Sequence, residues 1–265
     1  MKDIDNIMKK FAVLLSSALI AAGNISCATE NIGLDLSREA LEKATGISLG
    51  YNASWSSHYV WRGESQSSKD MSPAIGADLG HSSGLYTGVW TGAITNSSIP
   101  SEFDWYFGYA TEFGPISIDI GDLYYFYPGE SDETQFNEYY LSLGTEIPLG
   151  MVAEDFSISP YVYLAYAPKW FGPNTPDAFY TELGVEGTIP GTGISVSYTY
   201  GNIDIDDLDG DAEKANDVDS WNYYYISFGF GEILGLDTSV TYHDAPGYKG
   251  DAGQDGFFVS LGHEW

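Results

Sequence analysis

The sequence has little positive charge. Its 265 residues include 10 Lys and Arg against 38 Asp and Glu, which gives a formal net charge of −28. A protein that binds nucleic acid needs a cationic surface to neutralise phosphates, so this composition argues against a nucleic-acid partner. One Cys and four His also leave little material for disulfides or metal sites, and we expect neither a metal centre nor a cofactor.

Long apolar runs are scarce as well. The clearest one, Phe11–Gly23, follows a pair of lysines and is too short to cross a bilayer as a helix, which needs about 20 residues. Ser26-Cys27-Ala28 fits a cleavage site, so residues 1–28 are predicted to be a secretory signal. A lipoprotein in which Cys27 is acylated is the alternative. No later run is long enough for a transmembrane helix, so a secreted chain of this kind can span a membrane only as strands.

Aromatic residues and glycine are abundant, with 21 Tyr, seven Trp and 31 Gly, as is typical of β-sheets with aromatic belts and tight turns. Apolar and polar residues alternate along Gly256–Trp265 and along Ile47–Arg62, which gives each segment one apolar face. An exposed apolar edge strand ending in Trp265 would promote aggregation of a soluble protein. In a closed barrel the last strand pairs with the first and no edge remains.

The same alternation predicts about twelve antiparallel strands, an even number as in bacterial outer-membrane barrels. We place them at residues 47–62, 72–80, 84–95, 102–112, 115–127, 135–147, 154–167, 177–190, 193–203, 220–231, 234–243 and 255–265. Connections of alternating length predict short periplasmic turns, longer extracellular loops and periplasmic termini. A soluble β-sandwich also has short alternating strands, but the signal sequence, the final Trp and the loop asymmetry favour the barrel.

The expected organisation is therefore all-β: an antiparallel transmembrane β-barrel over residues 47–265 in the outer membrane of a Gram-negative cell. Residues 29–46 are a short periplasmic leader, in which Ser37–Gly46 is predicted to form a small helix. The runs Tyr124–Tyr127 and Tyr223–Tyr225 lie toward the long loops, and we interpret them as the outer aromatic girdle.

A string of short segments resembles a known family. The segments are Tyr59–Gly63, Ser65–Ser67, Pro73-Ala74, Gly84–Trp90, Asp104–Tyr109, Tyr124–Gly129 and Asn137–Tyr140. Through this string, residues 51–144 are similar to the TorF-type porin family of bacterial outer membranes. The resemblance fades after Gly144. It implies a porin-like barrel without catalytic residues, and the substrate of the family is itself poorly defined.

If the apolar face of each strand meets lipid, the opposite face lines the lumen. That face supplies many acids and two candidate cations: Asp78, Asp104, Asp119, Glu138, Glu146, Glu182, Glu186, Asp237, Glu264, Arg62 and His58. A low-dielectric wall of one charge sign concentrates counter-ions, and rings of Asp and Glu favour cations. We therefore predict that these residues line a narrow, cation-preferring pore for passive diffusion of small solutes. The alternative is a closed lumen in which the acids are paired or lie beyond the membrane.

Arg62 is the one Lys or Arg that we place inside a strand, near the outer mouth. We interpret it either as a structural salt bridge that holds the first outer loop or as a constriction with loop acids such as Glu64. Many inward positions are Gly, including Gly121 and Gly201. These glycines either leave space for water or give neighbouring aromatic rings a surface to cover.

No catalytic site is predicted. A barrel hydrolase needs a serine, a histidine and an acid within hydrogen-bond reach. His58 is expected in the lumen near the outer rim, whereas His243 and His263 are expected on the lipid side at opposite rims. We therefore predict that the protein is not an enzyme. A closed structural or adhesive barrel acting through acidic extracellular loops is the first alternative, and a hydrolase is the second.

The acidic segment Asp204–Glu213 suggests calcium binding, but it lacks the first and last ligands of an EF-hand loop. We predict a solvated loop, with loose divalent bridging to lipopolysaccharide as the alternative. The expected partners are outer-membrane lipid and lipopolysaccharide, small solutes or cations, and the barrel-assembly machinery through the strand ending in Trp265.

Overall fold

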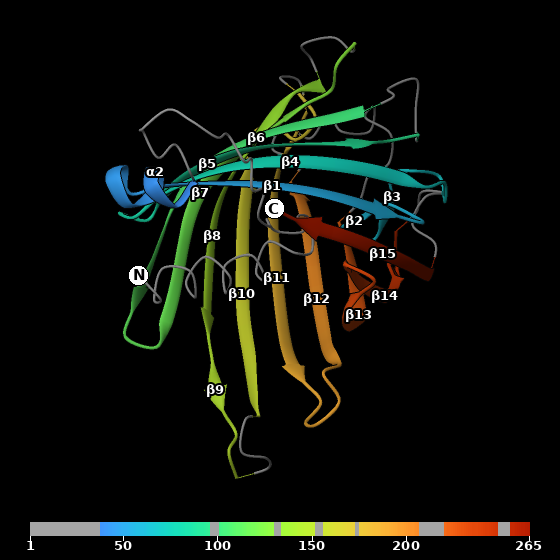
Figure 1. Ribbon diagram of the computed structural model, residues 1–265. Helices are drawn as coiled ribbons and strands as arrows, with labels where there is room; N and C mark the ends of the chain where they lie inside the picture. Colours follow the sequence, from blue (N-terminus) through green and yellow to red (C-terminus); the bar gives the residue numbers. More distant parts are fainter. Residues whose placement is uncertain are drawn as a thin grey trace.

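The structure, a computed structural model, describes residues 38–95, 101–129, 134–151, 156–172, 175–206, 220–248 and 255–265. Twelve long strands form a closed antiparallel barrel (Figure 1). They are β1 (Ile47–Ser56), β4 (Ser72–His81), β5 (Leu85–Ala93), β6 (Ser101–Phe113), β7 (Ile116–Phe126), β8 (Phe136–Thr145), β10 (Ser157–Ala167), β11 (Asp177–Thr188), β12 (Ser195–Asp206), β13 (Trp221–Ile233), β14 (Leu236–Asp244) and β15 (Gly256–Glu264). The predicted all-β barrel is confirmed. The predicted signal and most of the acidic segment lie outside the described residues.

The first predicted strand is wrong at its end. The wall strand β1 stops at Ser56, and the chain then turns inward to form a hairpin of β2 (Val60–Trp61) and β3 (Glu64–Ser65). Its two-residue turn is Arg62-Gly63, with φ angles of 49° and 82°. Two positive φ angles define the turn that matches the twist of a tight hairpin. The sequence pattern missed this hairpin because Tyr59 and Trp61 continue the two-residue spacing of the aromatic residues of β1.

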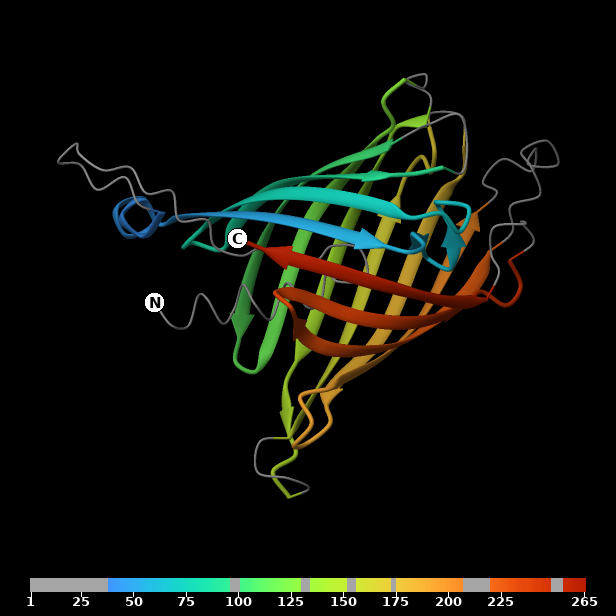
Figure 2. The ribbon, with the colours of Figure 1, turned by 45° about the vertical axis from the view of Figure 1, so that its right-hand side comes forward.

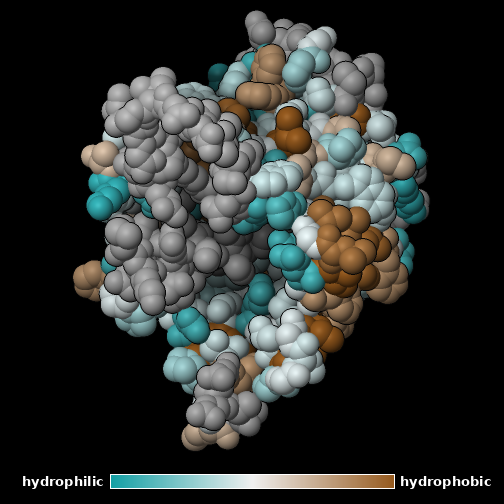
Figure 3. Space-filling view, viewed as in Figure 1, coloured by the Kyte–Doolittle hydropathy of each residue, from teal (hydrophilic) through white to brown (hydrophobic). Residues whose placement is uncertain are grey.

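The outward face of the barrel is apolar. Large apolar side chains that are exposed on the wall strands include Tyr51, Ile75, Leu79, Leu85, Trp105, Phe107, Ile120, Phe179, Leu183, Tyr198, Phe228 and Phe257. Figure 3 shows hydrophobic side chains gathered in a patch on the outer surface. A closed barrel pairs its backbone groups between strands, so its apolar belt can face hydrocarbon. This is the construction of a barrel in the bacterial outer membrane.

The barrel closes between its first and last strands. β1 pairs with β15 over five residues, from Asn52–Glu264 to Ser56–Ser260, and with β4 over ten. Tyr51 and Trp265 extend the closure with two backbone hydrogen bonds of 3.0 and 3.3 Å. Figure 2 shows β1 and β15 side by side. The edge-free arrangement expected from the apolar last strand is therefore present.

Among the described residues, helix α2 (Arg38–Thr45) precedes the barrel, within the segment predicted as helical. It ends at Gly46, whose φ of 72° is a left-handed conformation that glycine adopts readily. Figure 2 shows α2 at one end of the barrel and the β2–β3 hairpin at the other. We call these the inner end and the outer end. Among the described residues, no helix is long and apolar enough to cross a membrane.

Candidate functional site in the barrel lumen

The lumen contains a chamber of about 940 Å³ that extends from the inner end of the barrel to the β2–β3 hairpin. His58, Tyr59 and Val60 line it beside the hairpin. Its walls carry many hydroxyl groups: Ser54, Ser56, Ser72, Ser117, Ser159, Ser195, Ser197, Thr199, Ser227, Ser239, Thr241 and Ser260. Its carboxylates are Glu112, Glu146, Glu186, Asp237 and Glu264. The described lining residues include no Lys or Arg, so the charged groups on the chamber wall are carboxylates.

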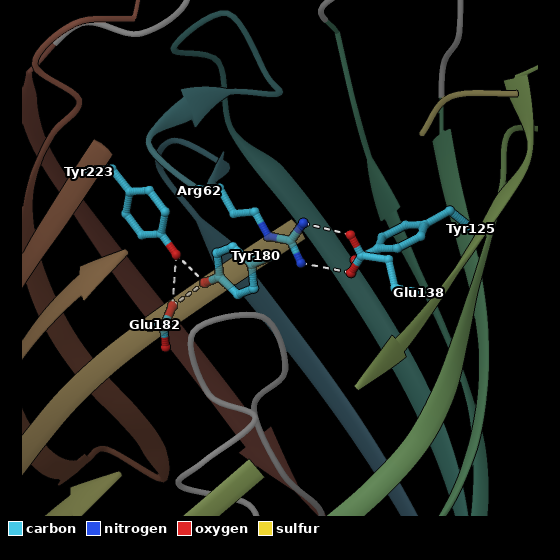
Figure 4. Close-up of polar contacts among 6 residues, drawn as sticks. All are labelled: Arg62, Tyr125, Glu138, Tyr180, Glu182 and Tyr223. Carbon is cyan, nitrogen blue, oxygen red and sulfur yellow. Dashed lines mark hydrogen bonds and ion pairs between the residues drawn. The ribbon is translucent and has the colours of Figure 1, made fainter. Parts of the chain in front are cut away.

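The hairpin tip lies across the lumen and is held by an ion pair. The guanidinium of Arg62 donates to both carboxylate oxygens of Glu138 on β8, at 2.6 and 2.7 Å. Its Cζ lies 3.7 Å from the ring centroid of Tyr180 on β11 and 4.3 Å from that of Trp61. Figure 4 shows the guanidinium between Glu138 and the ring of Tyr180. The expected salt bridge is present, and its acid is Glu138, far along the chain, rather than the adjacent Glu64.

Two further hydrogen bonds hold the hairpin backbone. The indole N–H of Trp221 donates to the carbonyl of Arg62 at 2.9 Å, and the N–H of Gly63 donates to the hydroxyl of Tyr225 at 2.7 Å. Both partners are on β13. The hairpin is therefore fixed to separate parts of the wall, β8 and β13, by contacts that do not all depend on the Arg62 side chain.

Tyrosine hydroxyls satisfy most of the buried lumenal acids. Glu182 accepts hydrogen bonds from Tyr161 (2.6 Å), Tyr223 (2.8 Å) and Tyr180. The other tyrosine–carboxylate pairs are Tyr86–Asp119, Tyr106–Asp78, Tyr59–Glu102 and Tyr125–Glu138. A buried carboxylate without partners is costly, and these hydroxyls replace the water that it loses. Neither Glu102 nor this use of the inward tyrosines is predicted by the sequence pattern.

Tyrosine rings pack against five of the inward glycines. An added Cβ would meet the ring of a tyrosine at each of five positions: Gly88 (Tyr106), Gly108 (Tyr86), Gly121 (Tyr140), Gly184 (Tyr161) and Gly201 (Tyr223). Each ring comes from a neighbouring strand and lies against the bare backbone. Of the two interpretations of these glycines, cover by aromatic rings is the one present at these positions.

The outer half of the lumen is packed with aromatic side chains around the hairpin. Trp61 contacts Tyr125 and Phe171, and Phe171 also contacts Phe136, with ring centroids 4.8 to 6.4 Å apart. Tyr125, Tyr127, Tyr223 and Tyr225 are all buried in this cluster. The prediction that both tyrosine runs form the outer girdle is therefore wrong for alternate residues of each run, because every second side chain of a strand points inward.

The predicted pore-lining residues fall into three groups. Asp78, Asp104, Asp119, Glu138 and Glu182 point inward in the tyrosine-rich part of the lumen, and four of the five are buried. Glu146, Glu186, Asp237 and Glu264 line the chamber. Arg62 and His58 are inside the lumen but belong to the inward-folded segment, not to a wall strand.

The expectation for His243 is wrong. It was placed on the lipid side, but β14 pairs Tyr242 with Phe257 on the outer face, so the next residue turns inward. His243 is fully buried, and its ring centroid lies 5.3 Å from that of His58. Neither of its ring nitrogens has a hydrogen-bond partner among the described residues. The sequence of β14 could have placed His243 correctly, because it has the same parity as the polar residues Asp237, Ser239 and Thr241.

His58 lies between the hydroxyl of Ser65 and the ring of His243. Its Nε2 lies 2.7 Å from the hydroxyl oxygen of Ser65. Burial, together with the nearby His243 and Lys69, lowers the pKa of His58 to about 4. A serine–histidine pair is thus present, but the ring beside it is a second imidazole, where a hydrolytic triad has a carboxylate. Within the described part of the chain, no cluster of three or more potential ligands is arranged to hold a metal ion.

Comparisons with known proteins agree with this architecture. A family described as "Bacterial protein of unknown function (Gcw_chp)" matches residues 40–249. No curated protein matches the sequence. The chain is similar to the solved NanC porin, with a TM-score of 0.53 and 11% identity over 81% of this chain and 98% of that one. An outer membrane channel from Pseudomonas putida F1 gives a TM-score of 0.45 and 11% identity over 82% of this chain and 94% of the channel. The NanC comparison shows a shared porin-like fold.

Proposed function

We propose that this chain, which belongs to the Gcw_chp family of bacterial proteins of unknown function, is an outer-membrane channel for passive diffusion of small cationic or neutral solutes. The observation that carries the proposal is the chamber: about 940 Å³ in volume, lined by hydroxyls and five carboxylates. Hydroxyl groups can replace water around a polar solute, and carboxylates in a low-dielectric wall concentrate cations.

The resemblance to TorF-type porins supports the same proposal. Three of the segments that carry it meet at the hairpin: Arg62 lies in the first, Tyr125 in a middle one and Glu138 in the last. We propose that the chain is a porin of this type. We also propose that its surroundings are those expected of one, with lipid and lipopolysaccharide against the apolar belt and the barrel-assembly machinery taking the strand that ends in Trp265.

Ion selectivity tests the proposal. Purified, refolded protein is placed in a planar bilayer under a KCl gradient, and the reversal potential is measured. We expect discrete conductance steps with a cation-selective potential. Neutralising two chamber acids in Glu186→Gln/Asp237→Asn should reduce the selectivity several-fold, and more strongly at low salt, because exposed charges are screened over about 10 Å at 0.1 M.

Asp122→Asn/Asp244→Asn is the matched control. It also removes two carboxylates, but Asp122 pairs with the exposed Tyr139, Asp244 pairs with Tyr224 on the outward face, and neither acid lines the chamber. Selectivity should therefore stay close to that of the parent. Anion selectivity of the parent would contradict the role given to the chamber acids. Absence of conductance from a demonstrably folded sample would favour the closed structural barrel instead.

A further inference from the structure

The guanidinium of Arg62 occupies a cage to which its own hairpin contributes only one side. Three residues of the cage come from three separate wall strands: Glu138 from β8, Tyr180 from β11 and Tyr125 from β7. The fourth, Trp61, precedes Arg62. A cation from the inserted hairpin thus sits in a site built largely by the wall, in the manner of a ligand (Figure 4).

The wall residues hold the cage in shape independently of Arg62. Tyr125 donates to Oε2 of Glu138 at 3.2 Å and so orients the carboxylate. Tyr180 is fixed through its hydroxyl to Glu182, which presents the ring face to the lumen. A carboxylate with both oxygens available and an aromatic face 3.7 Å from the cation centre form a combination suited to a planar guanidinium.

The cage discriminates between kinds of cation. A guanidinium makes two parallel hydrogen bonds to one carboxylate and stacks on a ring, whereas an ammonium is a compact point charge that cannot do both. The carboxylate is buried, with 1% of Glu138 exposed, so an occupant must lose its water and replace it with these contacts. This favours the weakly hydrated guanidinium.

The cage also lies beside the chamber. Val60, two residues before Arg62, lines the chamber, and so does Tyr161, whose hydroxyl donates to the same Glu182 that holds Tyr180. A solute cation concentrated by the chamber acids would therefore meet the hairpin and the cage behind it.

We infer that the cage formed by Glu138, Tyr125 and Tyr180 is a binding site for guanidinium-bearing solutes, and that Arg62 fills it as a built-in competitor. This inference rests on the proposed function in one respect: the channel supplies the route by which a solute reaches the cage. Displacement of Arg62 would free the hairpin tip from β8 and leave it held by its backbone contacts to β13.

A glycine at position 62 empties the cage while preserving the hairpin turn. Arg62 has a φ of 49°, in the left-handed region that glycine adopts freely. The bonds from Trp221 to the residue-62 carbonyl and from Gly63 to Tyr225 remain available. Arg62→Gly therefore leaves a vacant cage, with Glu138 lacking its counter-ion, that an added guanidinium can occupy.

The test is chemical rescue of thermal unfolding. Refolded Arg62→Gly protein in detergent is heated, and the unfolding midpoint is measured with methylguanidinium, methylammonium or urea at the same millimolar concentration. Methylguanidinium is expected to raise the midpoint by several degrees toward that of the parent. Methylammonium has the charge without the shape, and urea has the shape without the charge, so neither should do so.

Arg62→Gly/Glu138→Gln is the matched control, because it has the same vacancy without the carboxylate, and no rescue is expected. If Arg62→Gly fails to refold alone, methylguanidinium in the refolding buffer should restore folding. Equal effects of the three additives, or equal rescue of the double variant, would overturn the inference. Rescue in a protein that does not conduct would support the guanidinium site and contradict the proposed channel. Conductance without rescue would support the channel and contradict the site.

Discussion

The outer half of the lumen is packed with tyrosine and tryptophan, whereas the chamber in the inner half is lined with serine, threonine and carboxylates. Both halves come from the inward face of the same strands. Most acids outside the chamber are bonded to tyrosine hydroxyls or to Arg62, apart from Asp104, whose Oδ1 has no partner among the described residues. The acids of the chamber border open space. An acid of the first kind contributes to folding, and one of the second kind contributes mainly to the electrostatic field of the chamber.

The largest predicted difference between the halves concerns a single carboxylate. Glu138→Gln leaves the guanidinium of Arg62, itself only 7% exposed, without its counter-charge. Removing one partner of a buried ion pair costs about 3–5 kcal/mol. We expect a loss of that size in the free energy of unfolding, measured by urea titration of the refolded barrel.

Glu186→Gln makes the same chemical change in the chamber. Glu186 has no partner of this kind among the described contacts, so its substitution should change the free energy of unfolding by no more than about 0.5 kcal/mol. Similar losses of stability in the two variants would contradict the division of the lumen into a packed part and an open chamber.

A second comparison uses two inward glycines. In Gly201→Ala the new methyl group meets the ring of Tyr223, which is fully buried and bonded to Glu182. Forcing extra volume into a well-packed site costs about 1–3 kcal/mol. In Gly229→Ala the nearest atom is the hydroxyl of Ser195 beside the chamber, which can rotate away. The urea midpoint should fall clearly in the first variant only, and a fall of equal size in both would show that the chamber wall is as tightly packed as the outer half.

The smallest predicted effect is a pH dependence at the border between the halves. The pKa of His58 is lowered to about 4 from an ordinary value of 6.5, so between these values the unfolded chain binds a proton that the folded one does not. Stability should therefore decrease as the pH falls through this window, by about 1–2 kcal/mol from this residue once screening by water in the adjoining chamber is allowed for. His58→Gln, which can still hydrogen-bond Ser65, should show a correspondingly shallower decrease over the same window. An identical dependence of stability on pH in both proteins would show that His58 is not the group that titrates.

The wall of the barrel was predictable from the sequence, whereas the contents of its outer half were not. A period of two fixes which residues face lipid, and it placed Asp104, Asp119 and Glu182 inside correctly. It could not show that the chain leaves the wall after Ser56, because Tyr59 and Trp61 continue the aromatic spacing of β1. Arg62-Gly63 was the available signal, since a glycine at a tight turn is a hairpin marker.

Partners within the lumen were beyond sequence reasoning for a different reason. Arg62 and Glu138 are 76 residues apart, and Tyr59 and Glu102 are 43 apart. Their meeting depends on the number of strands in the barrel and on the stagger between them, which the alternation does not specify. The prediction of inward acids missed one residue of each kind, Glu112 in the chamber and Glu102 among the buried acids.

The closure of the barrel has a consequence for its dynamics. β1 is registered with β15 over five residues but with β4 over ten, so the two edges of one strand differ in how firmly they are paired. Local opening begins where fewest bonds must break. Backbone amides of β1 that point toward β15 should therefore exchange with solvent deuterium sooner than those that point toward β4. The seam that removes the last free edge is then also the more weakly paired edge of β1.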